Sequence, residues 1–302
     1  MNVSTENFLS SVIHTIAYAD VFEYPLTAGE IHRYLTSTKG SFEQVCQALE
    51  EGDTRITAVG GYFTLRGREH LVEIRERRAE IATRLWHKAR RYGRVIASLP
   101  FVRMVAVTGS LAMNNTEEDK DIDFMIVTMP GRLWTVRALS LLVARFARLE
   151  SLSLCPNYLV TTHALGLKER SLYVAHELAQ MVPLSGMEIY YELRRLNHWT
   201  EDYLPNAVTA PDPSREISNV PAFASIQKAL EFLFRFPLMS WFETWEMDRK
   251  IARLTQEQSL SLESCFSGDV CKGHRDGHGE NVAAALAVRL QQTTVVSASE
   301  IV

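Results

Sequence analysis

The stretch VTGSLAMNNTEEDKDIDFMIVT, residues 107–128, decides which fold the chain can adopt. It begins in an apolar, strand-like run that breaks at Gly109-Ser110. It ends in a second apolar run that carries Asp121 and Asp123 at alternate positions. Side chains two apart on a strand point to the same face and lie roughly 7 Å apart. Because buried charge is costly without a partner, the pattern predicts that a cation lies beside the second strand.

A divalent metal ion is the partner that fits two neighbouring carboxylates. Like charges this close raise a pKa unless a cation lies between them. Oxygen ligands with few protein contacts favour Mg²⁺ (or Mn²⁺), which keeps open positions for phosphate groups. Gly109 and Ser110 add exposed N–H groups and a hydroxyl, which favour an anion where a helix begins. Together they predict in-line transfer of a nucleotidyl or phosphoryl group.

These residues resemble the signature of the nucleotidyltransferase superfamily that includes DNA polymerase β, kanamycin nucleotidyltransferase and the minimal nucleotidyltransferases. The shared features are a Gly-Ser pair, a spacer of ten residues and an acid–apolar–acid strand, here Gly109-Ser110 and Asp121-Ile122-Asp123. The resemblance covers roughly residues 100–165. The whole chain is also similar to a group of bacterial proteins with a winged-helix front and a nucleotidyltransferase centre.

The resemblance implies an enzyme that moves a nucleoside monophosphate from a triphosphate such as ATP to a hydroxyl group. Asp121 and Asp123 would be the catalytic metal ligands, and Gly109 and Ser110 would bind the nucleotide phosphates. Magnesium or manganese would be the cofactor. The acceptor, a small molecule or a protein, stays open.

Asn157 is a departure from the family pattern. Family members usually carry a third carboxylate on a following strand, and Asn157 stands in its place as a possible metal ligand. An amide oxygen can bind a metal, but it is neutral and a poor base. Either the protein is a catalytically impaired nucleotide- or partner-binding protein, or another group supplies the acid or base. The candidates are the acids Glu177 and Glu188 and the histidines His163 and His176, for which a structural role is the alternative.

Residues 1–66 predict three helices followed by a β-hairpin at Gly60-Gly61, the layout of a winged helix. Thr27 and Glu30 form a predicted capping box at the second helix, and Ser41 begins the third. This segment has four basic and eight acidic residues, and its third helix has no Lys or Arg. Because DNA affinity depends on neutralising phosphates, we expect a packing or partner-binding role and no DNA binding.

The remaining pattern predicts an α+β fold, in which a nucleotidyltransferase core with a mixed sheet and flanking helices follows the winged-helix-like domain. Beyond the core the pattern is mostly helical. The predicted parts are a winged-helix-like domain at 1–66, a long connecting helix at 67–98, the core at 99–184, a helical C-terminal region at 185–290 and a disordered tail at 291–302.

A second group of potential ligands lies in GDVCKGHRDGHGE, residues 268–280. One interpretation is a zinc site, because the spacing of Cys271, His274 and His278 suits zinc ligands. Cys265 or Asp269 would be the fourth ligand. A lid in which Lys272 and the histidines cover the phosphate site is another interpretation. A polar glycine-rich loop before a helix is the third.

Aromatic residues from Trp134 onward predict a core more than a nucleobase platform. They are Trp134, Trp199, Trp241, Trp245, Phe232, Phe234, Phe236 and Phe242.

The composition is that of an ordinary globular protein, with 46% hydrophobic and 23% charged residues. A net charge of −4 gives no general attraction to nucleic acid or to an anionic membrane. The first residues have no basic segment typical of a signal peptide, and no apolar run approaches the roughly 20 residues of a membrane span. Four scattered cysteines form no disulfide framework. We therefore expect a soluble cytoplasmic protein.

Overall fold

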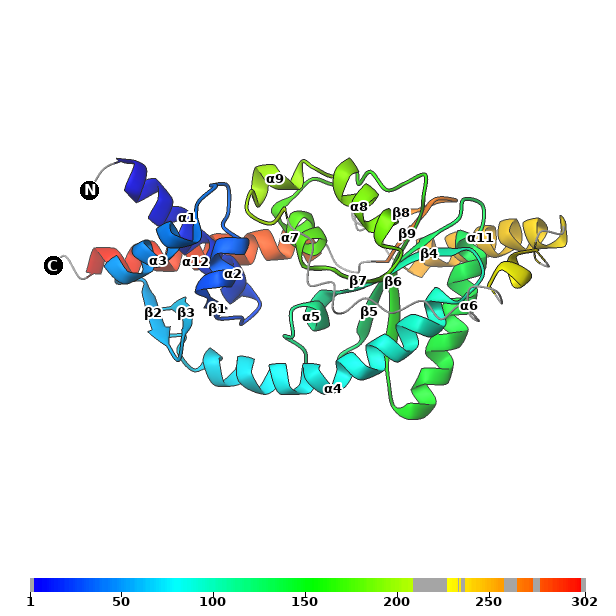
Figure 1. Ribbon diagram of the computed structural model, residues 1–302, viewed down its shortest axis with the longest axis horizontal. Helices are drawn as coiled ribbons and strands as arrows, with labels where there is room; N and C mark the ends of the chain where they lie inside the picture. The colour runs from blue at the N-terminus through cyan, green and yellow to red at the C-terminus, as the bar shows by residue number, and fades with distance from the viewer. Residues whose placement is uncertain are drawn as a thin grey trace.

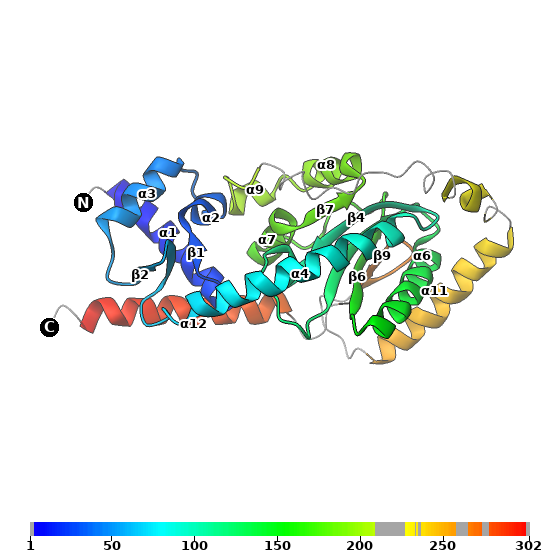
Figure 2. The same cartoon turned by 60° about the horizontal axis from the view of Figure 1, so that its bottom comes forward.

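The computed structural model describes residues 3–208, 227–232, 234, 237–257, 265–273 and 278–299. The fold is α+β. A small helical module lies at one end and a mixed sheet with flanking helices at the other, and one long helix runs between them (Figures 1 and 2). The predicted fold class is thus confirmed at this level.

The N-terminal module, residues 3–66, has the predicted order of three helices and a hairpin. Strand β3 pairs antiparallel with both β1 and β2. The capping box is present, because Thr27 Oγ1 accepts from the Glu30 N–H at 3.3 Å and the Glu30 carboxylate accepts from the Thr27 N–H at 2.8 Å. The module contains α1 (Val3–Val21), β1 (Leu26–Thr27), α2 (Ala28–Arg33), α3 (Phe42–Glu51), β2 (Ile56–Val59) and β3 (Tyr62–Leu65).

The large sheet has the strand order β7-β4-β5-β6-β9-β8. The β5–β6 pair is parallel, and every other neighbouring pair is antiparallel. Strand β5 is apolar because both of its faces are buried. The strands of this sheet are β4 (Val102–Thr108), β5 (Ile122–Thr128), β6 (Leu154–Thr161), β7 (Val182–Ser185), β8 (Cys265–Phe266) and β9 (Val270–Lys272).

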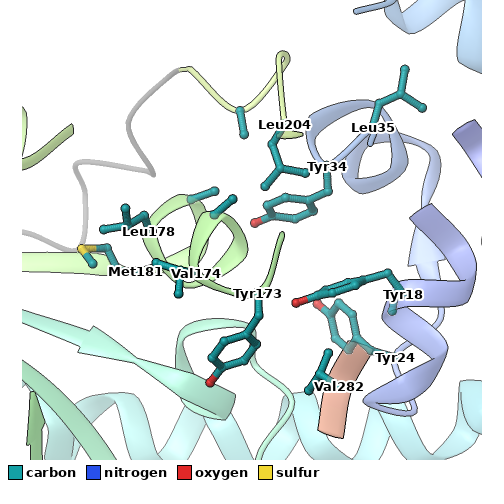
Figure 3. Packing of buried hydrophobic residues seen from close by; sticks show 14 of the residues in the cluster. Tyr18, Tyr24, Tyr34, Leu35, Tyr173, Val174, Leu178, Met181, Leu204 and Val282 are labelled. Atoms are coloured by element: carbon teal, nitrogen blue, oxygen red, sulfur yellow. The ribbon is translucent and has the colours of Figure 1, made fainter. Parts of the chain in front are cut away.

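Helices pack on both faces of this sheet and form two hydrophobic clusters. Met125 and Val127 belong to the cluster that includes α7 and the N-terminal module, part of which Figure 3 shows. Ile122, Phe124 and Ile126 belong to the cluster under α4 (Leu71–Ala97) and α6 (Leu133–Ala147). The helices that follow α4 are α5 (Gly109–Ala112), α6 (Leu133–Ala147), the 3₁₀ turn η1 (Arg148–Glu150), α7 (Leu172–Gln180), α8 (Met187–Leu196), α9 (Thr200–Tyr203) and α11 (Pro237–Glu257).

Three short strands depart from the predicted helical character of the C-terminal region. Strand β7 crosses the boundary expected at residue 184, and β8 and β9 return late in the sequence to extend the sheet beside β6. Each has only two to four residues. Segments this short carry no periodicity of their own, so their pairing with neighbouring strands determines their conformation.

One long helix connects the two ends of the molecule, and a second lies along the N-terminal module. Helix α4 (Leu71–Ala97) runs from the module to the sheet, and α12 (His278–Ser299) packs along α1 (Figure 1). Asp20 on α1 is almost fully buried and accepts hydrogen bonds from Arg289 at 2.6 Å and from Arg68 at 3.0 Å. Helix α12 continues to Ser299, whereas the sequence predicts a disordered tail from residue 291.

The aromatic residues divide between core and surface. Trp134 and Trp199 are buried, as predicted. Trp241, Trp245 and Phe232 are exposed by 64%, 45% and 74%, so the core interpretation is wrong for them. Phe236 lies outside the described residues. No helix in the described part of the chain has both the length and the apolar character to cross a membrane.

Candidate functional site

Gly109 and Asp123, from the two halves of the motif, lie against each other. Strands β4 and β5 pair so that Thr108 stands opposite Asp123, and Gly109 follows directly with a φ of +65°. A Cβ atom at position 109 would lie 2.7 Å from Asp123 Oδ2. Only glycine accepts both the positive φ and this close approach without strain.

The two halves of the motif line one cavity of about 640 Å³. Its wall combines the start of α5, the first half of β5, the middle of β6 and one face of α7. The site residues that line it are Gly109, Ser110, Asp123, Asn157 and Glu177.

Asn157 reaches this cavity at an irregularity in the sheet. The β5–β6 register moves from Phe124 opposite Pro156 to Met125 opposite Tyr158, so Asn157 has no partner position on β5. Such irregularities redirect side chains, and they recur beside functional sites. Asn157 thus lies on the same cavity as Asp123.

Burial and the charge of a neighbouring carboxylate raise the pKa values of two cavity carboxyls. The pKa of Asp123 is raised to about 7, first by burial and then by the charge of Asp121, while a hydrogen bond with Cys155 opposes the shift. The pKa of Glu177 is also raised to about 7, by burial and by Asp123, against the lowering effect of Lys272. A cation in the cavity would favour the charged forms of both acids.

Asp121 takes a different position from Asp123. It directly precedes β5 and is exposed, and it does not line the cavity with the other motif residues. The negative charge of Asp121 nevertheless contributes to the raised pKa of Asp123. Within the described ranges, no group of three or more His, Cys, Asp and Glu side chains converges as a metal cage. The oxygen donors present fit instead an ion held by few protein ligands, whose other positions phosphates would fill.

The structure separates the four candidates for the missing acid or base. Glu177 lines the cavity, whereas Glu188 and His163 are exposed and lie outside it. His176 lines the cavity but is 3% exposed, and its ring stacks on Tyr18 with centroids 3.9 Å apart. Burial lowers the pKa of His176 to about 3, so this histidine is neutral near pH 7 and packs as a structural residue.

The cysteine- and histidine-containing segment is partly strand, and its side chains have different surroundings. Cys271 is buried in β9, and Lys272 Nζ lies 2.6 Å from a Glu169 carboxylate oxygen. His278 lines the cavity at the start of α12, with its ring edge-on to Tyr173. Asp269 accepts a hydrogen bond from the Thr161 hydroxyl at 2.6 Å. His274 lies outside the described residues, and no zinc cluster occurs among the side chains that are described.

The N-terminal module and α4 contribute cavity residues that the sequence analysis did not identify. Tyr18, Tyr24 and Tyr34 line the cavity from the module, and Arg78 lines it from α4. Arg78 donates to Glu117 at 2.7 Å, in the loop between the two motif halves, and to Glu23 at 2.9 Å. No sequence signal marks these residues, because only tertiary packing brings them to the motif.

Comparison with known proteins gave no significant match to a protein-family model, to a curated protein or to a solved structure.

Proposed function

We propose that this protein is a Mg²⁺- or Mn²⁺-dependent nucleotidyltransferase, which moves a nucleoside monophosphate from a nucleoside triphosphate to a hydroxyl group. The observation that carries the proposal is the fit of the Asp123 carboxylate against Gly109 at the wall of a cavity. It joins the predicted phosphate-binding turn to a predicted metal ligand. The proposed fold is correspondingly a nucleotidyltransferase core preceded by a winged-helix-like module.

Each motif residue has a distinct role in this proposal. Asp123 and Asp121 hold the metal ion, which would neutralise phosphate charge during an in-line displacement. Gly109 lets a phosphate approach the backbone, and Ser110 donates its hydroxyl to the phosphate. Lys120 also lines the cavity and adds a positive charge beside Asp121.

Glu177 is the side chain best placed to supply the carboxylate that Asn157 lacks. It lines the same cavity as Asp123, and its raised pKa of about 7 suits a carboxylate that acts as a general base, accepting a proton from an attacking hydroxyl near neutral pH. In this role Glu177 would deprotonate the acceptor, and the neutral Asn157 would contribute at most an oxygen ligand.

The proposed role of the N-terminal module is to complete the cavity rather than to bind DNA. Its tyrosines line the cavity, and its third helix carries no basic residue that could neutralise phosphates. The expected affinity for duplex DNA at physiological salt is no better than roughly 10⁻⁴ M. A sequence-selective, submicromolar complex in a gel-shift titration would contradict this role.

The test of the function is metal-dependent use of triphosphates. Each of ATP, GTP, CTP and UTP is incubated with the protein and Mg²⁺ or Mn²⁺, and pyrophosphate release is measured. The metal and triphosphate should also raise the melting temperature, because a ligand at a hundred times its dissociation constant adds about 2.7 kcal/mol to the free energy of unfolding. The Asp121→Asn, Asp123→Asn double variant should lose both effects.

Asp119→Asn is the matched control, because Asp119 is an exposed acid in the same loop that does not line the cavity. It should keep the full response. An unchanged melting response in the double variant would remove Asp121 and Asp123 as metal ligands.

A second candidate function is nucleotide or partner binding without catalysis, which the neutral Asn157 at the cavity favours. It predicts triphosphate binding without pyrophosphate release. Asn157→Asp should tighten Mn²⁺ binding about tenfold, since the added carboxylate faces a divalent cation. Manganese titration and melting curves on both proteins test this. Lower stability with unchanged manganese affinity would remove Asn157 from the site.

A further inference from the structure

The cavity extends from the motif to a wall that the N-terminal module builds. Ser110 and Asp123 line one part of it, and Tyr18, Phe22 and Tyr34 line another. Figure 3 shows Tyr18 and Tyr34 extending from the module towards α7. The whole space, about 640 Å³, is within the range of small-molecule sites. One ligand can therefore contact both parts.

Tyr18 brings an unused hydrogen-bonding group to this wall. Its side chain is 3% exposed, and the described part of the chain offers its hydroxyl no hydrogen-bond partner. Because this hydroxyl has no partner and is still not fully occluded by protein, it faces the cavity that Tyr18 lines. A buried hydroxyl without a partner costs free energy, which a ligand that bonds to it recovers.

The neighbouring rings are held in fixed positions. His176 stacks on Tyr18 with an interplanar angle of 11°, and the Arg75 guanidinium lies 4.1 Å from the centroid of Tyr24. The Tyr24 hydroxyl donates to Glu30 or to the Met113 carbonyl, at 2.9 and 2.8 Å. A wall whose side chains are already ordered loses little entropy when a ligand binds.

We propose that the nucleoside part of the donor triphosphate lies between the N-terminal module and α7, with the Tyr18 hydroxyl as a hydrogen-bond partner. The inference rests on the proposed nucleotidyl transfer, in which Gly109 and Ser110 bind the phosphates. A nucleobase is a planar aromatic group that stacks on aromatic side chains, and its edge and ribose carry groups that pair with a phenol. Tyr18 is thus a binding residue for the donor, and the module is part of the nucleotide site.

The experiment compares ligands that differ only in the nucleoside. Dissociation constants are measured by calorimetry with Mn²⁺ for ATP, GTP, CTP, UTP and inorganic tripolyphosphate, on the wild type and on Tyr18→Phe. The variant keeps the ring and removes one oxygen. It should bind the preferred nucleoside triphosphate about three- to tenfold more weakly, the effect of one hydrogen bond. Tripolyphosphate binding should not change.

Tyr190→Phe is the matched control. Tyr190 is 1% exposed, has a buried hydroxyl without a partner within the described ranges, and does not line the cavity. It should bind both ligands like the wild type.

Three results would overturn the inference. The first is unchanged nucleoside triphosphate binding by Tyr18→Phe, which would leave this wall to the acceptor. The second is an equal loss for tripolyphosphate, which would mean a general disturbance of the cavity. The third is a wild-type protein that binds tripolyphosphate as tightly as it binds each of the four nucleoside triphosphates. Failure of the proposed function looks different, because then neither kind of ligand binds in a manner that depends on Asp123.

Discussion

Gly109 and Asp123 meet through the backbone pairing of two neighbouring strands, whereas Tyr18 and Arg78 reach the same cavity through side-chain contacts between distant segments. We call the first the motif wall and the second the module wall. The motif wall depends on the absence of a side chain at one position. The module wall depends on ion pairs and hydrogen bonds that hold the loop between the motif halves, such as Arg78 with Glu117. The two walls should therefore respond differently to substitution.

The largest expected effect is at the motif wall. Gly109→Ala adds a Cβ 2.7 Å from Asp123 Oδ2 at a φ of +65°, so steric overlap adds to backbone strain. The expected loss of unfolding free energy is about 3 kcal/mol, together with loss of triphosphate binding. Gly131→Ala separates the two causes, because Gly131 has a φ of +68° but no atom within 4 Å of the added Cβ. It should cost about 1 kcal/mol, and equal losses in denaturant titrations would contradict the steric argument.

The next effect is the pH dependence of Glu177, which lines the cavity from α7 and whose pKa responds to the charge of Asp123 in the motif wall. The pKa of Glu177 is raised from 4.5 to about 7, so between these values the folded state keeps a proton that the unfolded state releases. Stability contributed by Glu177 is therefore full below about pH 4.5 and falls as the pH rises to about 7. Glu177→Gln should remove this fall, a difference of about 2 kcal/mol at pH 8.

Stability measured across pH 4–8 on both proteins tests the sign. In the wild type, the stabilisation by Mn²⁺ should grow over the same interval, because the ion binds the charged carboxylates. A wild type and a variant with parallel pH profiles would show that the Glu177 carboxyl titrates normally.

The smallest effect is expected at the module wall. Arg78→Met keeps much of the aliphatic contact but leaves Glu117 and Glu23 without their cation. Both acids are more than 40% exposed, so the stability cost is about 1 kcal/mol. The free energy of triphosphate binding should fall by more than the free energy of unfolding, since the loop between Gly109 and Asp123 loses its ion pair with Arg78.

Arg84→Met on the same helix is its control. Arg84 pairs with Glu118 at 2.6 Å, but both side chains are largely exposed, so no measurable change is expected. Equal behaviour of the two arginine variants in triphosphate titrations would mean that the ion pairs of Arg78 do not position the loop.

The same contrast explains how far the sequence could be interpreted. Strand β5, the capping box at Thr27 and the start of the third helix at Ser41 are local patterns, and the structure contains them. Asn157 and Glu177 could be named as candidates but not chosen between, because their distance from Asp123 depends on the sheet irregularity and on α7. Tyr18 gave no signal, since an aromatic residue on an apolar helix is typical of any core.

Two tryptophans on α11 show the opposite case, in which a sequence pattern predicts burial that the structure does not have. Trp241 and Trp245 follow an apolar pattern typical of a core, yet they are exposed on α11. Burial of a helix face depends on which element packs against it, and composition does not specify that element. The assignment of Trp134 to the core succeeded because α6 packs directly on β6.

The buried carboxylate of Asp20 has a consequence for the order of events during synthesis. Its two arginine partners, Arg68 and Arg289, lie 48 and 269 residues further along the chain. While the ribosome is still making the sheet, the nascent N-terminal module already carries an acid whose second partner does not yet exist. Arg289 also lines the cavity, so the nucleotide site that we propose is completed only after α12 has emerged and docked. A ribosome-bound chain would therefore hold the finished motif wall before it could retain a nucleotide.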